Sequence, residues 1–135
     1  MNIVIVEYVA ALIGSVALDG VWLGVISKSW YKKYIGDLML EKPHLIPALL
    51  FYLIYGAATV VFIIDPAIRN SWSTSAIIFR AALLGLIIYG AYDLTNLAVL
   101  KGWSIPITLI DIAWGMTFTT LVSLIAIYLT KLIIK

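Results

Sequence analysis

Three aspartates lie inside stretches of the sequence that are otherwise almost entirely apolar: Asp19, Asp93 and Asp111. An ionisable side chain within a membrane span costs about 2.5 to 3.5 kcal/mol on insertion scales, so such residues usually face the bundle interior and are functional. Burial and a neighbouring like charge favour the neutral form of a carboxyl group, so one aspartate could act as an acid and another as a base. We therefore predict these three as candidate catalytic residues, with Asp93 the first choice.

Each aspartate has polar or aromatic companions three or four residues away, a spacing that places side chains on one face of a helix. Trp22 and Trp114 each follow an aspartate by three residues. Their indoles are suited to walling an apolar cavity and donating one N–H hydrogen bond each. The other predicted substrate-binding residues are Tyr89, Asn96 and Thr108. The alternative is that these groups only bond one another and hold the helices together.

Two further charged residues lie near the opposite end of their apolar stretches. Glu7 and Arg80 are at matching depth if the two helices are neighbours. We expect them to form a structural ion pair that neutralises two buried charges and takes no part in the site.

A metal site is a minor alternative for the aspartates. Hard cations such as Mg²⁺ prefer oxygen ligands, so the three carboxylates could hold Mg²⁺, and that metal could clamp a phosphate-bearing lipid. However, the paired-carboxylate helix spacing of membrane prenyl- and phosphotransferases is missing, and His44 is a lone loop residue. The sequence assigns no metal, and the cofactor, if any, is unknown.

Composition identifies the chain as a membrane protein, because 64% of its residues are hydrophobic and only 12% are charged. A membrane-spanning helix needs about 20 predominantly apolar residues. Four stretches meet this requirement, at residues 3–27, 45–64, 76–100 and 107–130. The formal charge of +2 is too small to indicate nucleic-acid binding, and the absence of cysteine excludes disulfides.

The segments between these stretches predict how the helices are arranged. Residues 29–42 have apolar side chains at helical spacing and charged side chains on the other side, which predicts an interfacial amphipathic helix that Pro43 ends. The other two loops are short, so neighbouring spans should be antiparallel. We predict an all-α, up-down-up-down four-helix bundle that forms a single transmembrane domain over residues 1–135.

Basic residues indicate the orientation of this bundle in a cell membrane. Five lysines lie in the first and third loops, against Arg69, Lys131 and Lys135 on the side of the termini. The positive-inside rule then places those two loops in the cytoplasm and both termini outside. Trp30, Tyr31 and Trp103 are predicted as anchors at the inner interface. The three aspartates would share one pocket near the cytoplasmic face.

Three motifs resemble those of a known family: residues 18–24 (Leu-Asp-Gly-Val-Trp-Leu-Gly), 92–98 (Tyr-Asp-Leu-Thr-Asn-Leu-Ala) and 111–115 (Asp-Ile-Ala-Trp-Gly). The chain is similar over nearly its whole length to an uncharacterised four-span membrane protein family of bacteria and some large viruses. This resemblance implies that the family's polar positions are Asp19, Trp22, Asp93, Asn96, Asp111 and Trp114. Its members often occur beside genes for fatty-acyl modification and flavin oxidases, which implies lipid chemistry without naming an activity.

The function favoured by the sequence is binding or modifying a lipid-like amphipathic small molecule at the aspartate pocket, so membrane lipid is the expected partner. Whether the protein is an enzyme stays open at this point. One alternative is a non-catalytic membrane subunit or scaffold within a larger complex, in which the polar residues serve packing alone. The other is a small proton- or cation-coupled carrier, which would require a homo-oligomer.

Overall fold

The computed structural model describes residues 2–134, and all regular structure in that range is helical. Met1 and Lys135 lie outside the described residues. Lys135 is one of the three basic residues that were counted on the side of the termini. Four helical segments are long and apolar enough to cross a membrane: Ile3–Ile26, Leu45–Arg69, Thr74–Val99 and Ile105–Ile133. The predicted fold class is therefore confirmed, and each of the four segments overlaps one predicted span, with boundaries that differ by a few residues.

The first span begins at an N-cap and ends in a widened turn. Helix α1 (Ile3–Val21) starts where the side chain of Asn2 accepts a hydrogen bond from the Val4 N–H at 3.0 Å. It continues as a π-helical turn, Trp22–Ile26, which closes when the Ser27 amide and hydroxyl both donate to the Trp22 carbonyl at 2.8 Å. This turn redirects the chain into the next helix.

The helix between the first two spans is shorter than predicted. Helix α2 (Lys28–Ile35) is followed by a 3₁₀ turn, Gly36–Leu38, and the chain then runs without regular structure to His44. The prediction of a helix over residues 29–42 was wrong at its C-terminal end. Gly36 explains the early end, because glycine has low helix propensity and no side chain to pack.

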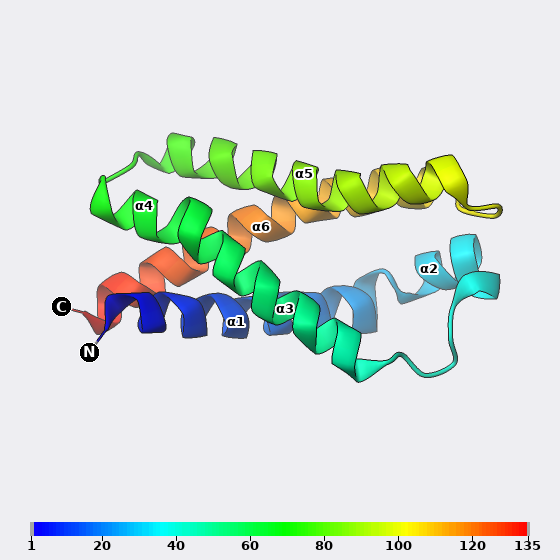
Figure 1. The fold of residues 1–135 in the computed structure, drawn as a ribbon, viewed down its shortest axis with the longest axis horizontal. Helices are drawn as coiled ribbons and strands as arrows, with labels where there is room; N and C mark the ends of the chain where they lie inside the picture. The colour runs from blue at the N-terminus through cyan, green and yellow to red at the C-terminus, as the bar shows by residue number, and fades with distance from the viewer. Residues whose placement is uncertain (1, 135) are drawn as a thin grey trace.

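The second span crosses the other helices at an angle. It comprises α3 (Leu45–Thr59), a π-helical turn (Val60–Ile64) and α4 (Asp65–Arg69). It is followed by α5 (Thr74–Val99) and α6 (Ile105–Ile133), which are capped by the hydroxyls of Ser73 and Ser104. Both termini lie at the end of the bundle that carries α4, whereas α2 lies at the other end with the α5–α6 turn (Figure 1). The spans therefore run up-down-up-down.

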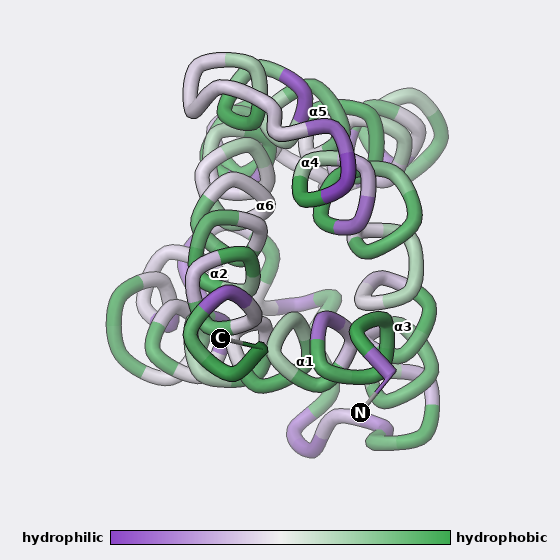
Figure 2. Tube along the Cα trace, turned by 90° about the vertical axis from the view of Figure 1, so that its left-hand side faces the viewer, coloured by the Kyte–Doolittle hydropathy of each residue, from purple (hydrophilic) through white to green (hydrophobic). Residues whose placement is uncertain are grey.

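The outer surface of the bundle is apolar. Green predominates along α1, α3 and α5 in the view along the bundle (Figure 2). Large hydrophobic side chains such as Leu45, Ile54 and Phe79 are more than two-thirds exposed. In a soluble protein such a surface would be an aggregation hazard, but in a membrane protein it faces lipid.

The closest helix packing joins α5 to α6. A Cβ atom added at Gly85 would lie 2.2 Å from the Gly115 carbonyl oxygen, so the two backbones touch there. Ala81, one turn earlier on α5, is fully buried. This is the close approach that small residues four positions apart permit in membranes. The second small-residue pair in the sequence, Gly20 and Gly24, faces open space.

Buried hydroxyl groups lie along the faces of α1, α3 and α6 that meet inside the bundle. Ser15, Thr59 and Ser123 each donate to the carbonyl oxygen four residues earlier in their own helix at 2.7 Å. The Tyr55 hydroxyl instead donates to Thr119 Oγ1 on another helix at 3.0 Å. Most of these hydroxyls are therefore satisfied locally, as is usual for serine and threonine in apolar helices.

The predicted ion pair between Glu7 and Arg80 does not form. The Arg80 guanidinium lies over the Trp72 ring, 4.2 Å from its centroid. Glu7 is fully buried, and among residues 2–134 neither carboxyl oxygen has a hydrogen-bond partner. The two residues are at similar depth, but α1 packs mainly against α6 and α3 rather than against α5. Matching depth was therefore not sufficient to bring them together.

Replacing Gly85 by Ala should destabilise the bundle, because the added methyl group would collide with the Gly115 backbone. We expect a loss of about 1 to 3 kcal/mol in the free energy of unfolding, measured by denaturant titration in mild detergent. Gly20→Ala is the matched control, since a Cβ there meets nothing within 4 Å. Equal effects of the two substitutions would contradict the predicted contact.

A double-mutant cycle on Glu7→Gln and Arg80→Gln should show independent effects. Because the two side chains do not touch, we expect a coupling energy below about 0.5 kcal/mol in unfolding experiments. A coupling energy of several kcal/mol would show that Glu7 and Arg80 do interact, and it would contradict the structure.

Candidate functional site

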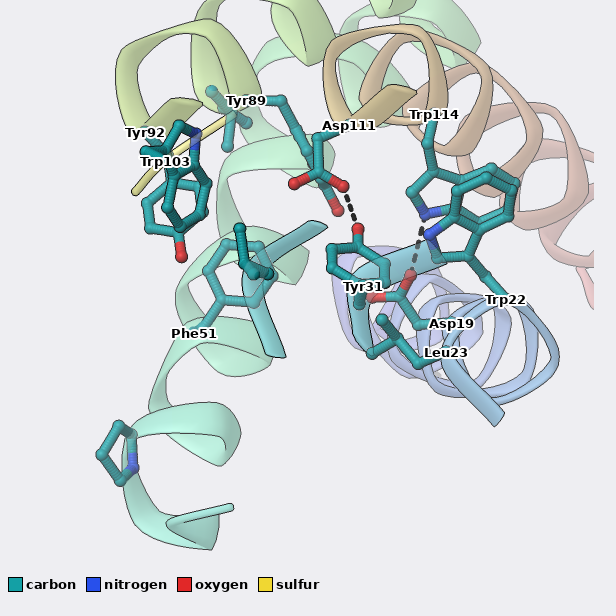
Figure 3. Close-up of a pocket in the computed structure, with 13 residues that line it drawn as sticks. Asp19, Trp22, Leu23, Tyr31, Phe51, Tyr89, Tyr92, Trp103, Asp111 and Trp114 are labelled. Atoms are coloured by element: carbon teal, nitrogen blue, oxygen red, sulfur yellow. Dashed lines mark hydrogen bonds between the residues drawn. The ribbon is translucent and has the colours of Figure 1, made fainter. Parts of the chain in front are cut away.

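A cavity of ≈640 Å³ lies at the end of the bundle that carries α2. Its wall is formed by residues of α1, α2, α3, α5 and α6, together with the π-helical turn after α1 and the α5–α6 turn (Figure 3). Its lining is mostly aromatic and aliphatic, with two carboxyl groups: Asp19, Trp22, Leu23, Tyr31, Ile35, Pro47, Phe51, Ile88, Tyr89, Tyr92, Trp103, Asp111 and Trp114.

The carboxyl group of Asp19 joins three helices. The Trp114 indole N–H of α6 donates to Oδ1 at 3.0 Å. The Tyr52 hydroxyl of α3 donates to Oδ2 at 2.8 Å. Each oxygen of this buried carboxyl group therefore has a donor from a different helix, which is the arrangement that burial of a polar group in an apolar bundle requires.

Two indoles stack beside this carboxyl group. The Trp22 and Trp114 rings lie with their centroids 4.3 Å apart and their planes inclined by only 4°. Trp30 of α2 approaches Trp22 edge-on, with a centroid distance of 5.8 Å. Both stacked indoles line the cavity, as the sequence predicted for these two residues. Because Trp114 is hydrogen-bonded to Asp19, the carboxyl group also fixes the orientation of the stack.

Asp111 is held differently from Asp19. The Tyr31 hydroxyl of α2 donates to its Oδ1 (Figure 3), and within the described residues no hydrogen bond reaches Oδ2. None of the α2 side chains is buried. Besides this hydrogen bond, α2 packs against α6 and against the π-helical turn after α1, where Trp30 meets Trp22. Asp111 therefore lines the cavity with one carboxyl oxygen already used and the other available as an acceptor.

The opposite wall comes from α3, α5 and the α5–α6 turn. Tyr92 meets the Trp103 ring edge-on at a centroid distance of 5.5 Å, and the Trp103 N–H donates to Thr108 Oγ1 at 3.1 Å. Phe51 faces this pair from α3 (Figure 3). Phe51 and Tyr92 are 39% and 56% exposed. Because α3 and α5 make little contact with each other, these partly exposed side chains border the gap through which the cavity opens.

Asp93 does not line the cavity, contrary to its predicted place in a shared pocket. It continues the α5 stripe of Ile77, Ala81 and Gly85 at four-residue spacing, and this stripe packs against α6. The side chain is fully buried, and within residues 2–134 neither carboxyl oxygen has a hydrogen-bond partner. In the part of the chain that the structure describes, no three His, Asp or Glu side chains cluster closely enough to hold a metal ion.

Of the other predicted binding residues, some line the cavity and some do not. Tyr89 lines the cavity. Thr108 is buried behind Trp103 and positions that ring, whereas half-buried Asn96 lies outside the lining. The predicted site residues that line the cavity are Asp19, Trp22, Tyr89, Asp111 and Trp114.

Two tyrosines that donate to the carboxyl groups do not stand out in the sequence. The sequence predicts Tyr31 only as an interfacial anchor, and it does not single out Tyr52. A usable signal was present, because a carboxyl group buried among apolar helices requires donors. Tyrosines near the loop-one ends of the spans were the available hydroxyl donors at that depth.

Replacing Tyr52 by Phe should destabilise the bundle by removing the donor to Asp19 Oδ2. Leaving a buried acceptor without a partner costs about 1 to 3 kcal/mol, and this loss should appear in the free energy of unfolding. Tyr128→Phe is the matched control, because that side chain is largely exposed. If the two variants unfold alike, the hydrogen bond does not hold α3 to α1.

A family model described as "Predicted membrane protein (DUF2177)" matches residues 4–128. No match was found among curated proteins or among solved structures. The matched range includes every residue that lines the cavity. The chain therefore belongs to the DUF2177 family of predicted membrane proteins, whose function is unknown.

Proposed function

We propose that this membrane protein binds a lipid-like amphipathic small molecule in the cavity beside Asp111. The observation that carries the proposal is an apolar, aromatic cavity with one carboxyl oxygen available to a ligand. The polar head would contact Asp111, and the apolar part would lie against the Trp22–Trp114 stack and Phe51.

The size and composition of the cavity support this function. Small-molecule sites usually have volumes of about 300 to 1,000 Å³ and apolar walls with a few well-placed polar groups. The observed cavity of ≈640 Å³ has two carboxyl groups among aromatic and aliphatic neighbours. It would hold a head group and the first part of a chain.

The position of the opening supports entry from the lipid phase. Phe51 and Tyr92 flank the open side, and neighbouring side chains such as Leu50 and Leu94 are more than half exposed. Asp19 and Asp111 lie seven and six residues from the nearer ends of their spans, or about 10 Å at the helical rise. The ligand's polar head would therefore lie just below the membrane surface.

The distribution of lysines indicates which side of the membrane carries the cavity. The end of the bundle that carries α2 has the excess of lysines, and the positive-inside rule places it in the cytoplasm. The ligand would then enter from the inner leaflet, while both termini would face outward.

The geometry changes which aspartate we assign to contact the ligand. Asp19 already accepts hydrogen bonds at both oxygens, so it serves to position Trp114 and Tyr52. Asp93 lies outside the lining. Asp111 is therefore the residue that would bind the head group, and the one that would exchange a proton with it if the ligand is modified.

Native mass spectrometry of gently purified protein tests the proposal. We expect the unmodified chain to retain a lipid-like species that Asp111→Asn loses, because the amide changes the charge and hydrogen bonding at Oδ2 while keeping the shape. Glu7→Gln is the matched control, since it neutralises a buried carboxyl group that does not line the cavity.

A second variant keeps the result interpretable if Asp111→Asn folds poorly. Ile35→Trp would narrow the cavity from α2, the helix with the fewest packing constraints, and it should also release the bound species. Equal retention of the same species by the unmodified chain and both cavity variants would contradict the proposed site.

A further inference from the structure

The ionisable side chains that line the cavity are acidic or phenolic. They comprise two aspartates and three tyrosines, and within the described lining there is no Lys, Arg or His. An anionic head group would therefore meet Asp19 and Asp111 without a compensating cation. A cationic head group would be attracted by both carboxyl groups, and its charge would favour their ionised forms.

Basic residues of α2 lie outside this cavity. Lys32 and Lys33 are exposed and line a separate hollow of ≈150 Å³, which shares only Ile35 with the cavity. Ile35 therefore separates these two lysines from the cavity, and neither lysine is among the residues that line the cavity with the aspartates.

Aromatic rings surround the space in front of the carboxyl groups. The Trp22–Trp114 stack forms one wall, while Phe51 and the Tyr92–Trp103 pair lie across from it (Figure 3). The faces of aromatic rings attract cations, and groups of such rings are a known means of binding ammonium groups in proteins. Carboxyl groups within an aromatic cavity combine two attractions for the same kind of ligand.

The hydrogen-bonding pattern favours a donor on the ligand. Both oxygens of Asp19 and Oδ1 of Asp111 already accept from Trp114, Tyr52 and Tyr31. Asp111 Oδ2 remains as an acceptor, which an ammonium N–H would satisfy.

We infer that the ligand is an amphiphile with a cationic nitrogen head group. This inference rests on the proposed function of the cavity and names the chemical class of its ligand. An aminophospholipid and a single-chain amine share this chemistry, so the experiment needs to distinguish them.

The test compares four probes with the same eight-carbon chain: octylammonium, octyltrimethylammonium, octyl sulfate and octyl glucoside. Binding is measured by calorimetry on the full chain in dodecyl maltoside micelles, which carry no nitrogen head group, with protein-free micelles correcting for partition into the detergent. We expect octylammonium to bind at least about tenfold more tightly than octyl sulfate, because charge and the aromatic rings both favour the cation.

Three variants assign this preference to the cavity. Asp111→Asn should reduce the ratio of the two affinities to about threefold or less, whereas Glu7→Gln should leave it unchanged. Tyr31→Phe frees Asp111 Oδ1 as a second acceptor for the ligand, so it should increase the preference for octylammonium, and a loss of that preference would count against the inference. Its result bears on the inference even if Asp111→Asn fails to fold.

The outcomes separate the two proposals. Equal binding of all four probes, or tighter binding of octyl sulfate, would overturn the cationic head group and leave an amphiphile site in place. Binding of none of them would contradict the proposed function itself. If octylammonium is preferred, native mass spectrometry from mixed nanodiscs decides the source. Retained phosphatidylethanolamine indicates a membrane lipid, and its absence indicates a single-chain amine.

Discussion

Two hydrogen bonds to the Asp19 carboxyl group hold the walls of the cavity in place. A carboxyl group among apolar helices has no water to solvate it, so its oxygens need donors from the protein. Trp114 and Tyr52 supply them from α6 and α3, and this joins the end of α1 to two other spans. The same bond orients the Trp114 ring, which then stacks on Trp22 and forms a wall of the cavity.

The cavity exists because the helices do not all pack equally closely. Gly85 and Gly115 allow α5 and α6 to touch, whereas α3 crosses the bundle at an angle and the second span meets α5 mainly through the π-helical turn at the far end of α3. The aromatic side chains that border the remaining space are too large to let the helices approach further. Helix α2 then covers this end of the bundle, and its Tyr31 contacts Asp111.

The class of the protein and the number of its spans could be predicted from sequence, because long apolar stretches have one physical explanation. Depth along each helix was also predictable, since the rise per residue is constant. Asp19 and Asp111 were thus placed correctly at one level. Rotation about the helix axis was not predictable in the same way, because lipid-facing and interior surfaces are both apolar.

The errors follow from that limit. Asp93 is at the expected depth but on the face that packs against α6, and Glu7 and Arg80 share a depth without being neighbours. The depth of Tyr52 makes it a candidate donor, but the sequence does not show which carboxyl group its hydroxyl meets. The donors to a buried carboxyl group are identified only when the order of the helices in space is known.

We propose that the space between Phe51 of α3 and Tyr92 of α5 is an open cavity that binds a ligand, with Asp111 at its polar end. An experimental structure of the protein in lipid nanodiscs, at a resolution that shows side chains, would test this proposal. We expect elongated density in this space, with its polar end at Asp111 Oδ2 and its apolar part against the Trp22–Trp114 stack. A structure in which α3 packs directly against α5 and no space remains beside Asp111 would contradict it.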